Sequence, residues 1–371
     1  MPVTNHQRQA CAPTALADLD RIIDLYAYEQ APQGHLAGTT TGGGAGAYCY
    51  YGAPTLAHLA GTEIASWVDG LLAHISRTNP SAEDFRVEFD GRAWRVCRDV
   101  SGDVGTQLNI RRLAPTTPLL AELRLGVPLV RELLLAPWLN DGGLVVFAGL
   151  NGQGKTTLAA STVRSRLERY GGRAITVEDV LEHPLEGTWG PGSCRQIQVN
   201  YDTVSRQSGF TGAVRRAYRS MPATRPAILY VGEVRDVETA EEVVKAASNG
   251  MLVITTAHAS DAGAAIERIA TLSQATMGDA ARSALAHALR LVVHQSLTLS
   301  PEKTGWDRGA FQQQILFSDG PAHPTANNIR RGEFAMMGQV QRFQQTRLAN
   351  ASRRGAGAAE LLRELGQAAG H

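Results

Sequence analysis

The sequence predicts an α/β protein with a parallel sheet, preceded by a smaller α+β domain. Three observations support this prediction. A glycine-rich loop with a single lysine follows a short apolar segment, other short apolar segments alternate with helical patterns after it, and the chain before it alternates with period 2. Continuous short apolar segments are typical of parallel strands that are buried on both faces. Strands that alternate with helices in this way predict a sheet that binds ligands at the carboxyl ends of its strands.

The composition excludes several classes of protein. A chain of 371 residues is expected to form two domains, and its hydrophobic fraction of 43% allows a substantial core. The formal net charge of +1 gives no overall basic field, so we expect no direct binding of nucleic acid. No apolar segment reaches the ~18 residues of a membrane span, and the N-terminus lacks the pattern of a secretory signal. The cysteines have no metal-type spacing and are expected to be reduced thiols of a cytoplasmic protein.

The N-terminal part of the chain predicts a small α+β domain. Residues 84–100 alternate apolar and polar side chains around Asp90-Gly91, which predicts a hairpin with a tight turn. Residues 106–113 have the pattern of one more strand. A domain of about 115 residues, the length of this part of the chain, can fold alone.

The boundary between the domains is predicted in the sequence APTTP, residues 114–118, because it breaks any regular element. This gives an N-terminal domain of residues 1–115 and a second domain of residues 116–371. Inside the first, residues 33–54 are rich in glycine, alanine and threonine. They lack the lysine that a phosphate-binding loop requires and are interpreted as a flexible loop.

The glycine-rich loop carries the first chemical signature. Its sequence GLNGQGKTT matches G-x-x-x-x-G-K-[ST], the signature of a phosphate-binding loop. Glycines let backbone N–H groups turn toward an oligophosphate, the ammonium of Lys155 neutralises the outer phosphates, and the Thr156 hydroxyl can bind Mg²⁺. The chain contains only two other lysines, Lys245 and Lys303, which argues against a chance match. The residues predicted to bind the nucleotide are Gly149, Leu150, Asn151, Gly152, Gln153, Gly154, Lys155, Thr156 and Thr157.

The segments around this loop give the order of the second domain. The strand before the loop is predicted over residues 143–149, and a helix of about residues 156–170 follows it and ends at Gly171-Gly172. Another helix is predicted over residues 237–249, with acidic residues early and a glycine after its end. Further buried strands are predicted over residues 174–177, 227–231 and 251–256.

Acidic side chains follow the predicted strands, where the catalytic groups of such a sheet are expected. Glu178 comes after one strand and Glu233 after another. A hydrolytic nucleoside triphosphatase needs a carboxylate that orients or deprotonates the attacking water, and one that holds Mg²⁺. We predict Glu233 and Glu178 in these catalytic and metal-binding roles, and the alternative for each is a helix cap or a surface acid. For Asp179 the alternative is a capping role in the turn.

One histidine is predicted at the same edge of the sheet. His258 ends the strand of the sequence VITTAH. A lone histidine at the end of a strand is usually structural, but this one would face the same site as Glu233. We predict that it senses the γ-phosphate or couples it to catalysis.

Four segments, taken in order, resemble the motifs of one family. The phosphate loop, ITVEDVLEHP, ILYVGEVRD and ASNGMLVITTAHAS are similar to the Walker A motif, Asp box, Walker B motif and His box of secretion and type IV pilus ATPases. Gly232 before Glu233, in place of the usual aspartate, is itself typical of that superfamily. The resemblance covers about residues 92–299 and points to the PilT-like ATPases of pilus retraction and the DotB-like ATPases of type IVB secretion and conjugation.

The resemblance implies a ring of two-domain subunits. The N-terminal domain would be PAS-like, and the second would be a RecA-like phosphate-loop motor domain with C-terminal helices. ATP and Mg²⁺ would bind between the domains of a homo-oligomer, which is expected to be a hexamer. Arginines of the N-terminal domain would complete the site. Arg95, Arg111 and Arg112 match them by position, with surface ion pairs as the alternative.

The sequence therefore predicts a ring-forming, Mg²⁺-dependent ATPase that powers a type IV secretion, conjugative transfer or type IV pilus machine. It would act in the cytoplasm at the inner face of the cytoplasmic membrane, attached through inner-membrane components of that machine. One alternative is a RecA-like DNA translocase or helicase, which the near-neutral charge disfavours. Another is a slow nucleotide-binding regulator docked on such a machine, which an intact Glu233 disfavours. A small-molecule kinase is disfavoured because no lid or acceptor pocket is recognisable.

Overall fold

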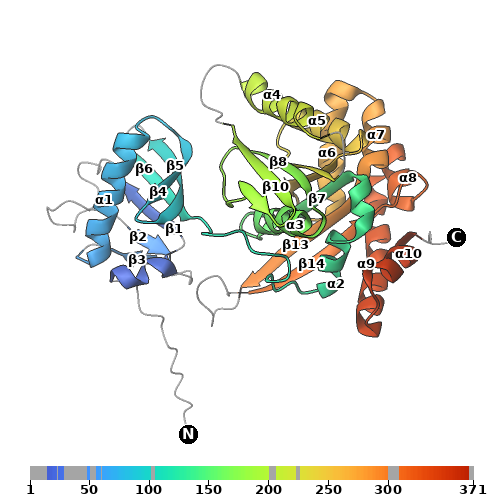
Figure 1. Cartoon of the computed structure of the whole chain (residues 1–371), viewed down its shortest axis with the longest axis horizontal. Helices are drawn as coiled ribbons and strands as arrows, with labels where there is room; N and C mark the ends of the chain where they lie inside the picture. Colours follow the sequence, from blue (N-terminus) through green and yellow to red (C-terminus); the bar gives the residue numbers. More distant parts are fainter. Residues whose placement is uncertain are drawn as a thin grey trace, which may run out of the picture. The chain divides into compact units, whose positions relative to one another are not determined.

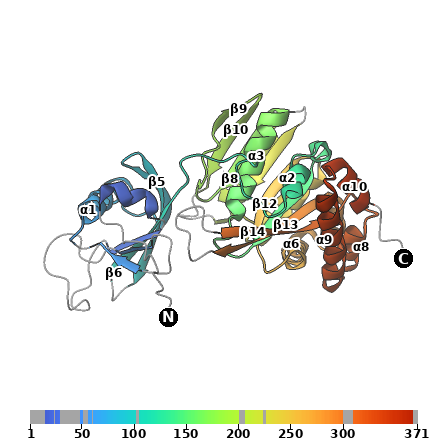
Figure 2. The same cartoon turned by 90° about the horizontal axis from the view of Figure 1, so that it is seen from below.

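The computed structural model describes residues 15–22, 24–28, 48–50, 56–59, 61–101, 105–199, 206–222, 226–299 and 309–366. Figure 1 shows the chain coloured along its sequence, and Figure 2 shows it turned by 90°. The chain divides into two compact units, Met1–Pro115 with Leu299–Gly309, and Thr116–Thr298 with Ala310–His371. The division after Pro115 falls inside the APTTP sequence, where prolines prevent a regular element from crossing it.

The first unit is an antiparallel sheet that packs one face against a helix. Its six strands lie in the order β3-β2-β1-β6-β5-β4, and each neighbouring pair is antiparallel. The helix α1 (Glu63–Thr78) places the apolar stripe of Ile64, Val68, Leu71 and Ile75 in the core beneath it. The other elements are η1 (Leu16–Arg21), β1 (Asp24–Tyr28), β2 (Tyr48–Tyr50), β3 (Leu56–His58), β4 (Asp84–Phe89), β5 (Arg92–Ser101) and β6 (Gly105–Arg112).

The hairpin predicted from the sequence is confirmed as the antiparallel pair β4 and β5. Asp90 and Gly91 at its tip have φ values of 53° and 67°, as the two central residues of a tight hairpin turn require. The predicted third strand is confirmed as β6, which pairs with β5. Of residues 33–54, interpreted as a loop, the structure describes 48–50, which form strand β2 instead. The remainder of that prediction lies outside the described residues.

The second unit is an eight-stranded sheet in the order β14-β13-β7-β12-β11-β8-β10-β9. The pairs from β13 through β7, β12, β11 and β8 to β10 are parallel, and only the short β9 is antiparallel to its partner β10 among the pairs described in these strands. The strands are β7 (Gly143–Gly149), β8 (Gly172–Glu178), β9 (Gly187–Trp189), β10 (Gly192–Gln198), β11 (Ala227–Val231), β12 (Leu252–His258), β13 (Leu289–Leu299) and β14 (Gly309–Phe317).

Helices pack on both faces of this sheet. Its strands are therefore continuous apolar segments in the sequence, as β7 illustrates. Val145 and Phe147 point into a core formed with α2, α3, α9 and α10, whereas Leu144 and Val146 point into a core formed with α5, α6 and α7. Figure 2 shows α2 and α3 on one face and α6 on the other. The helices are α2 (Pro128–Leu134), η2 (Pro137–Asp141), α3 (Lys155–Tyr170), α4 (Arg206–Arg219), α5 (Val237–Ser248), α6 (Ala262–Met277), α7 (Ala280–Ala288), α8 (Pro324–Arg331), η3 (Phe334–Met336), α9 (Met337–Arg354) and α10 (Ala358–Gly366).

The strands and helices predicted for the second domain are confirmed as β7, β8, β11, β12, α3 and α5, with small shifts at their ends. β8 includes Glu178, which was predicted to follow the strand, and β12 ends at His258, as predicted from the sequence VITTAH. The strands β9, β10, β13 and β14 were not predicted from the sequence. None of the described helices has the length and apolar character needed to cross a membrane.

Candidate active site

The phosphate loop joins β7 to α3, and two of its glycines are required by their surroundings. A Cβ atom on Gly149, whose φ is 149°, would lie 2.4 Å from the carbonyl oxygen of Gln295. Gly154 has the left-handed φ of 77°, and a Cβ there would lie 3.0 Å from Gln295 Nε2. Any side chain at these positions would displace the loop from β13, so the glycines fix the loop close to the sheet.

Gln295 and Gln153 hold the loop in place. Gln295 on β13 is 2% exposed, and its Nε2 donates a hydrogen bond to the Gln153 carbonyl oxygen at 2.5 Å. The Gln153 side chain in turn accepts a hydrogen bond from the backbone N–H of Leu297. The loop is therefore tied to a neighbouring strand before any ligand arrives, which reduces the ordering that binding requires. Gln295 was not among the predicted site residues, because β13 was not predicted from the sequence.

Lys155 begins α3 at the inner side of the loop and is 6% exposed. Its Nζ donates to the carbonyl oxygen of Leu150 at 2.8 Å and lies 3.3 Å from Nδ1 of His258. Burial lowers the pKa of this ammonium, and the charge of Glu233 acts in the opposite direction. A buried cation, the hydroxyls of Thr156 and Thr157 and the N-terminus of a 16-residue helix are the donor set that an oligophosphate requires. The residues present thus fit the phosphates of a nucleotide.

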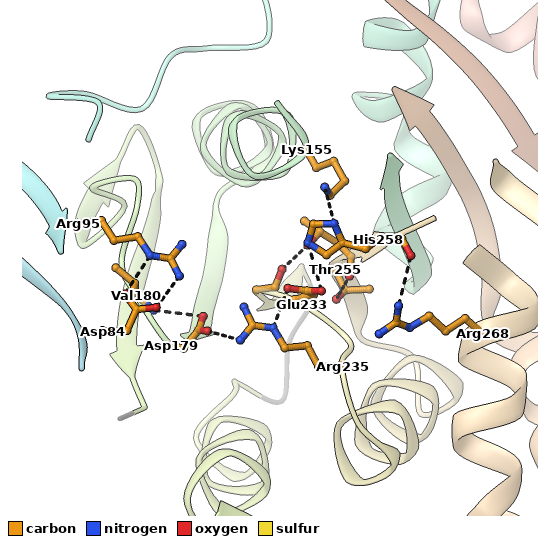
Figure 3. A network of polar contacts seen from close by, with 12 residues as sticks. Asp84, Arg95, Lys155, Asp179, Val180, Glu233, Arg235, Thr255, His258 and Arg268 are labelled. Carbon is orange, nitrogen blue, oxygen red and sulfur yellow. Dashed lines mark hydrogen bonds and ion pairs between the residues drawn. The ribbon is translucent and has the colours of Figure 1, made fainter. Parts of the chain in front are cut away.

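His258 connects the loop to the acidic side chain after β11 (Figure 3). The pairing of β12 with β7 places His258 beside Gly149, and its Nε2 lies 3.4 Å from Oε1 of Glu233. Because an ammonium can only donate hydrogen bonds, the contact with Lys155 requires Nδ1 to be the unprotonated nitrogen. Burial lowers the pKa of the imidazole, Glu233 raises it and Lys155 lowers it. The neutral ring therefore carries its proton on Nε2, toward Glu233.

Glu233 follows β11 and is held at both oxygens. Its Oε2 accepts a hydrogen bond from Nε of Arg235 at 2.7 Å, and Nη1 of Arg235 lies 2.7 Å from Oδ2 of Asp179 (Figure 3). The Glu233 side chain is 14% exposed, so it still reaches solvent. Asp179 thus pairs with a guanidinium rather than only capping backbone groups. No role was predicted for Arg235, although its position two residues after the candidate acid Glu233 was a usable signal.

Glu178 lies in the interior rather than in this series of contacts. It is 3% exposed, and its Oε1 accepts a hydrogen bond from Nε2 of Gln196 at 3.3 Å. Burial raises the pKa of this carboxyl to about 7. A Cβ atom on Gly232 would lie 3.3 Å from Glu178 Cγ, so an aspartate there would crowd and repel Glu178. Its predicted role toward water or metal stays a prediction.

Arg95 and Arg111 lie on the face of the first unit's sheet opposite to α1. They are cross-strand partners on β5 and β6, and Trp94, next to Arg95, points into the core on the other side. Arg95 makes two hydrogen bonds to Asp84, at 3.0 and 2.7 Å (Figure 3). Nε of Arg111 lies 2.7 Å from Oδ1 of Asp24. Both arginines thus make the ion pairs expected as the alternative to a role at the nucleotide.

Arg112 points to the opposite face from its neighbour, because successive side chains of a strand alternate. It is the cross-strand partner of Trp94, its side chain is 12% exposed, and its Nη2 lies 2.8 Å from Oδ1 of Asp20. A second guanidinium nitrogen donates to the Asp20 carbonyl oxygen at 2.6 Å. Arg112 therefore fastens η1 to β6. The participation of all three arginines in a nucleotide site stays a prediction.

Candidate metal ligands are sparse in the described part of the chain, where no group of three or more histidine, cysteine, aspartate or glutamate side chains could hold a metal ion. Thr156, Glu178 and Glu233 were predicted as ligands of Mg²⁺. Magnesium keeps several water ligands and is bound by one or two protein oxygens together with substrate phosphates. The sparse ligand set is therefore compatible with Mg²⁺ that arrives with a nucleotide.

Comparison with known proteins adds three similarities in sequence. A family model described as Type II/IV secretion system protein matches residues 76–341, which is more than half of the chain. The chain is 31% identical over 226 residues to the type IV pilus ATPase PilU of Pseudomonas aeruginosa, covering 60% of this chain and 53% of PilU. It is 35% identical over 197 residues to the pilus retraction ATPase PilT of the same organism, covering 53% and 52%. The chain thus spans about half the length of these curated relatives.

Two solved structures are similar to most of the chain. The pilus retraction motor PilT with bound ADP has a TM-score of 0.65 at 20% identity and covers 92% of this chain and 94% of that one. The DotB ATPase of Legionella pneumophila has a TM-score of 0.57 at 20% identity, with coverage of 87% and 85%. At this identity the likeness concerns the fold. It confirms the predicted α/β class with a smaller N-terminal domain.

Proposed function

Because this chain belongs to the Type II/IV secretion system protein family, we propose that it is an ATPase that powers a type IV secretion, conjugative transfer or type IV pilus machine. One observation carries the proposal. Lys155 of the phosphate loop, His258 at the end of β12 and Glu233 after β11 form one series of contacts. A phosphate-binding cation and a candidate base therefore belong to one site, as nucleotide hydrolysis requires. The similarity to PilU and PilT, which are named as ATPases, supports the same activity.

In the proposed reaction the loop holds the phosphates of ATP. The ammonium of Lys155 neutralises the outer phosphates, and backbone N–H groups of residues 149–154 and of the first turn of α3 donate to their oxygens. The Thr156 hydroxyl binds the Mg²⁺ that accompanies the nucleotide. This ion supplies positive charge against the phosphoryl oxygens during transfer. Gln295, which braces the loop from β13, keeps this arrangement in place.

Glu233 orients the attacking water and accepts its proton. The hydrogen bond from Arg235 and the contact with His258 fix the carboxylate, so that its charge is presented in one orientation. Glu178 assists water or Mg²⁺ in this proposal. Because burial raises its pKa to about 7, a substantial fraction of this carboxyl is protonated near neutral pH.

The catalytic unit of the proposal is a ring, a homo-oligomer expected to be a hexamer. Arg95, Arg111 and Arg112 of the N-terminal domain would supply positive charge to the phosphoryl oxygens, which a phosphate loop and a base alone do not fully neutralise. We place the ring in the cytoplasm, at the inner face of the cytoplasmic membrane, docked on inner-membrane components of the machine.

The test is steady-state ATP hydrolysis by the purified full-length chain with Mg²⁺, compared with its Lys155→Ala variant. We expect the substitution to abolish turnover and nucleotide binding while the fold survives, because the phosphates would meet a loop without its cation. Lys245→Ala is the matched control, since Lys245 pairs with Glu241 on the exposed side of α5. A folded Lys155→Ala protein that hydrolyses ATP at nearly the normal rate would contradict the proposed site.

A further inference from the structure

His183 lies beside the phosphate loop and takes part in none of the contacts described above. It is on the segment after β8, is 6% exposed, and its Nε2 lies 3.1 Å from Oγ1 of Thr157 in the first turn of α3. Its other ring nitrogen, Nδ1, is buried and meets no hydrogen-bond partner among the described residues. Burial lowers the pKa of this imidazole, with Glu182 acting in the opposite direction, so the ring is neutral at neutral pH.

The segment that carries His183 is held by one buried side chain. Nε2 of Gln196 on β10 donates to the His183 carbonyl oxygen at 3.0 Å. Its Oε1 accepts from the backbone N–H groups of Leu185 and Glu186 at 2.7 and 2.9 Å. The Thr117 hydroxyl also donates to the next carbonyl oxygen, that of residue 184, at 2.8 Å. The imidazole is thus fixed against α3 by backbone contacts on both sides.

The two ring nitrogens of His183 decide which way the hydrogen bond with Thr157 runs. If Nε2 accepted a hydrogen bond from the hydroxyl, the neutral ring would carry its own proton on Nδ1, and that N–H would be buried without an acceptor among the described residues. Orphaned buried N–H groups are rarer in proteins than acceptors with a free lone pair. The favoured tautomer therefore has its proton on Nε2 and donates to Oγ1 of Thr157.

The direction of this bond fixes what Thr157 can offer to a ligand. A hydroxyl has a single hydrogen, and one that was given to His183 would leave only lone pairs to face an anion. When His183 donates instead, the Thr157 hydrogen is free to point out of the first turn of α3, where the helix N-terminus favours negative charge. Thr157 is partly exposed and lies in the first turn of α3, directly after the phosphate loop.

We propose that His183 is a positioning residue of the phosphate site, whose Nε2–H fixes the Thr157 hydroxyl as a hydrogen-bond donor to a phosphate oxygen of the bound nucleotide. The inference rests on the proposed function, since it needs a nucleotide in the loop. His183 is not part of the phosphate-loop signature. It lies at the site because the segment after β8 packs on α3. His183 acts through Thr157 and does not itself touch the nucleotide.

The first test reads the tautomer directly. Full-length protein labelled with ¹⁵N-histidine is compared by NMR with its His183→Gln variant at pH 7.5, which assigns the His183 signals. We expect Nε2 to show the shift of a protonated nitrogen and Nδ1 that of an unprotonated one. The reverse pattern would overturn the inference, whatever the affinity measurements show.

The second test measures the equilibrium affinity of the variants for ADP. We expect Thr157→Val and His183→Leu each to weaken binding about tenfold, which corresponds to ~1.4 kcal/mol. The double variant should be no weaker than either single variant, because both remove the same donor. His183→Gln should bind nearly as the wild type, since its amide N–H can replace Nε2–H. The matched control is His323→Leu, which removes another buried histidine, bonded to Leu365, without touching the loop.

These outcomes separate the inference from the proposed function. A wild-type protein that does not bind ADP contradicts the proposed function itself. A wild type that binds ADP, with His183→Leu equally tight or with losses that add in the double variant, overturns only the role of His183. If His183→Leu does not fold, the comparison of Thr157→Val with the conservative His183→Gln variant, together with the tautomer, decides the question.

Discussion

The imidazole of His258 separates the cation of the phosphate loop from the candidate base by one ring: Nδ1 lies 3.3 Å from Nζ of Lys155, and Nε2 lies 3.4 Å from Oε1 of Glu233. The two contacts are possible together only in one tautomer, with the proton on Nε2. A phosphate that draws the Lys155 ammonium toward itself would weaken the first contact, and the ring would then be free to follow Glu233. The contact between His258 and Glu233 would therefore depend on whether a phosphate occupies the loop.

This relationship predicts a specific effect of His258→Ala. The variant should still bind ADP, because Lys155 and the loop remain, but it should lose much of its preference for an ATP analogue over ADP. We expect turnover to fall by at least about tenfold, in the range found when a proton-transfer or coupling group is removed. Affinities for both nucleotides and the rate of hydrolysis are the measurements. His287→Ala, which changes an exposed histidine on α7, is the matched control. Unchanged discrimination between the nucleotides would assign His258 a structural role.

Glu233→Gln keeps the shape of the side chain and removes its charge and basicity. We expect ATP to bind with nearly normal affinity, while hydrolysis falls by ~10²-fold or more, as for loss of a general base. Single-turnover hydrolysis together with equilibrium binding separates the two effects. Glu267→Gln on the exposed face of α6 serves as the control for a lost surface charge. A variant that stops binding nucleotide would recast Glu233 as a structural or metal-holding residue.

Alternation along β6 predicts that substitution of Arg112 has an effect on stability that substitution of Arg111 lacks. Arg111 shares a sheet face with Arg95, whereas Arg112 fastens η1 through Asp20. Substitution of Arg95 or Arg111 by alanine should cut turnover sharply and leave ATP affinity within about tenfold, about 1.4 kcal/mol. Arg112→Ala should also cut turnover and should in addition lower the thermal stability of the first unit, because it removes the contacts with Asp20. Calorimetry and hydrolysis assays on each single variant check this expectation, and normal turnover of Arg95→Ala and Arg111→Ala would contradict it.

The proposed ring can be tested with the same variants. Turnover per subunit should rise with protein concentration as rings form, because the arginines act only in the assembled site. When Arg95→Ala protein is mixed with Glu233→Gln protein, activity should partly return if one subunit supplies the arginine and another the base. Activity that is independent of concentration, or mixtures as inactive as their components, would exclude completion of the site across subunits. The assignment of the phosphate loop would stand in either case.

The buried carboxyl of Glu178 is expected to make the stability of the folded protein depend on pH. Burial raises its pKa from 4.5 to about 7, so between these values the folded protein keeps a proton that the unfolded chain releases. The free energy of unfolding should therefore fall as the pH rises through this window, by up to about 3 kcal/mol at 1.36 kcal/mol per pKa unit. Denaturant unfolding without nucleotide or Mg²⁺, from pH 4.5 to 8, measures it. Glu178→Gln should remove this slope and be the more stable protein at pH 8, while Glu168→Gln on α3 should keep it. An identical slope in wild type and Glu178→Gln would show that Glu178 is ionised in the folded protein.

Much of the fold follows from local sequence signals. The segment of β7 reads as a continuous apolar run because its alternate residues enter two different cores, and the Asp90-Gly91 turn reads as a hairpin because few residues accept positive φ there. The predicted strands of residues 174–177 and 251–256 end one and two residues before the observed strand ends at Glu178 and His258. β13 and β14 were not predicted, and each contains a polar residue that the structure buries, Gln295 in β13 and Gln313 in β14.

For the candidate site, too, some features follow from the sequence and others only from the tertiary structure. The sequence by itself determined the phosphate loop, since the pattern around Lys155 is set by the chemistry of an oligophosphate, and it determined which acids and which histidine follow the strands. Only the tertiary structure decided that the ring of His258 contacts both Lys155 and Glu233, whereas Glu178 is buried and hydrogen-bonded to Gln196. The physical reason is that exposure and hydrogen-bond partners come from strands adjacent in space but distant in the chain. Glu233 and Glu178 have similar positions in the sequence, each at or just after the end of a buried strand. In the structure Glu233 stays within reach of solvent beside Arg235, whereas burial favours the neutral form of Glu178.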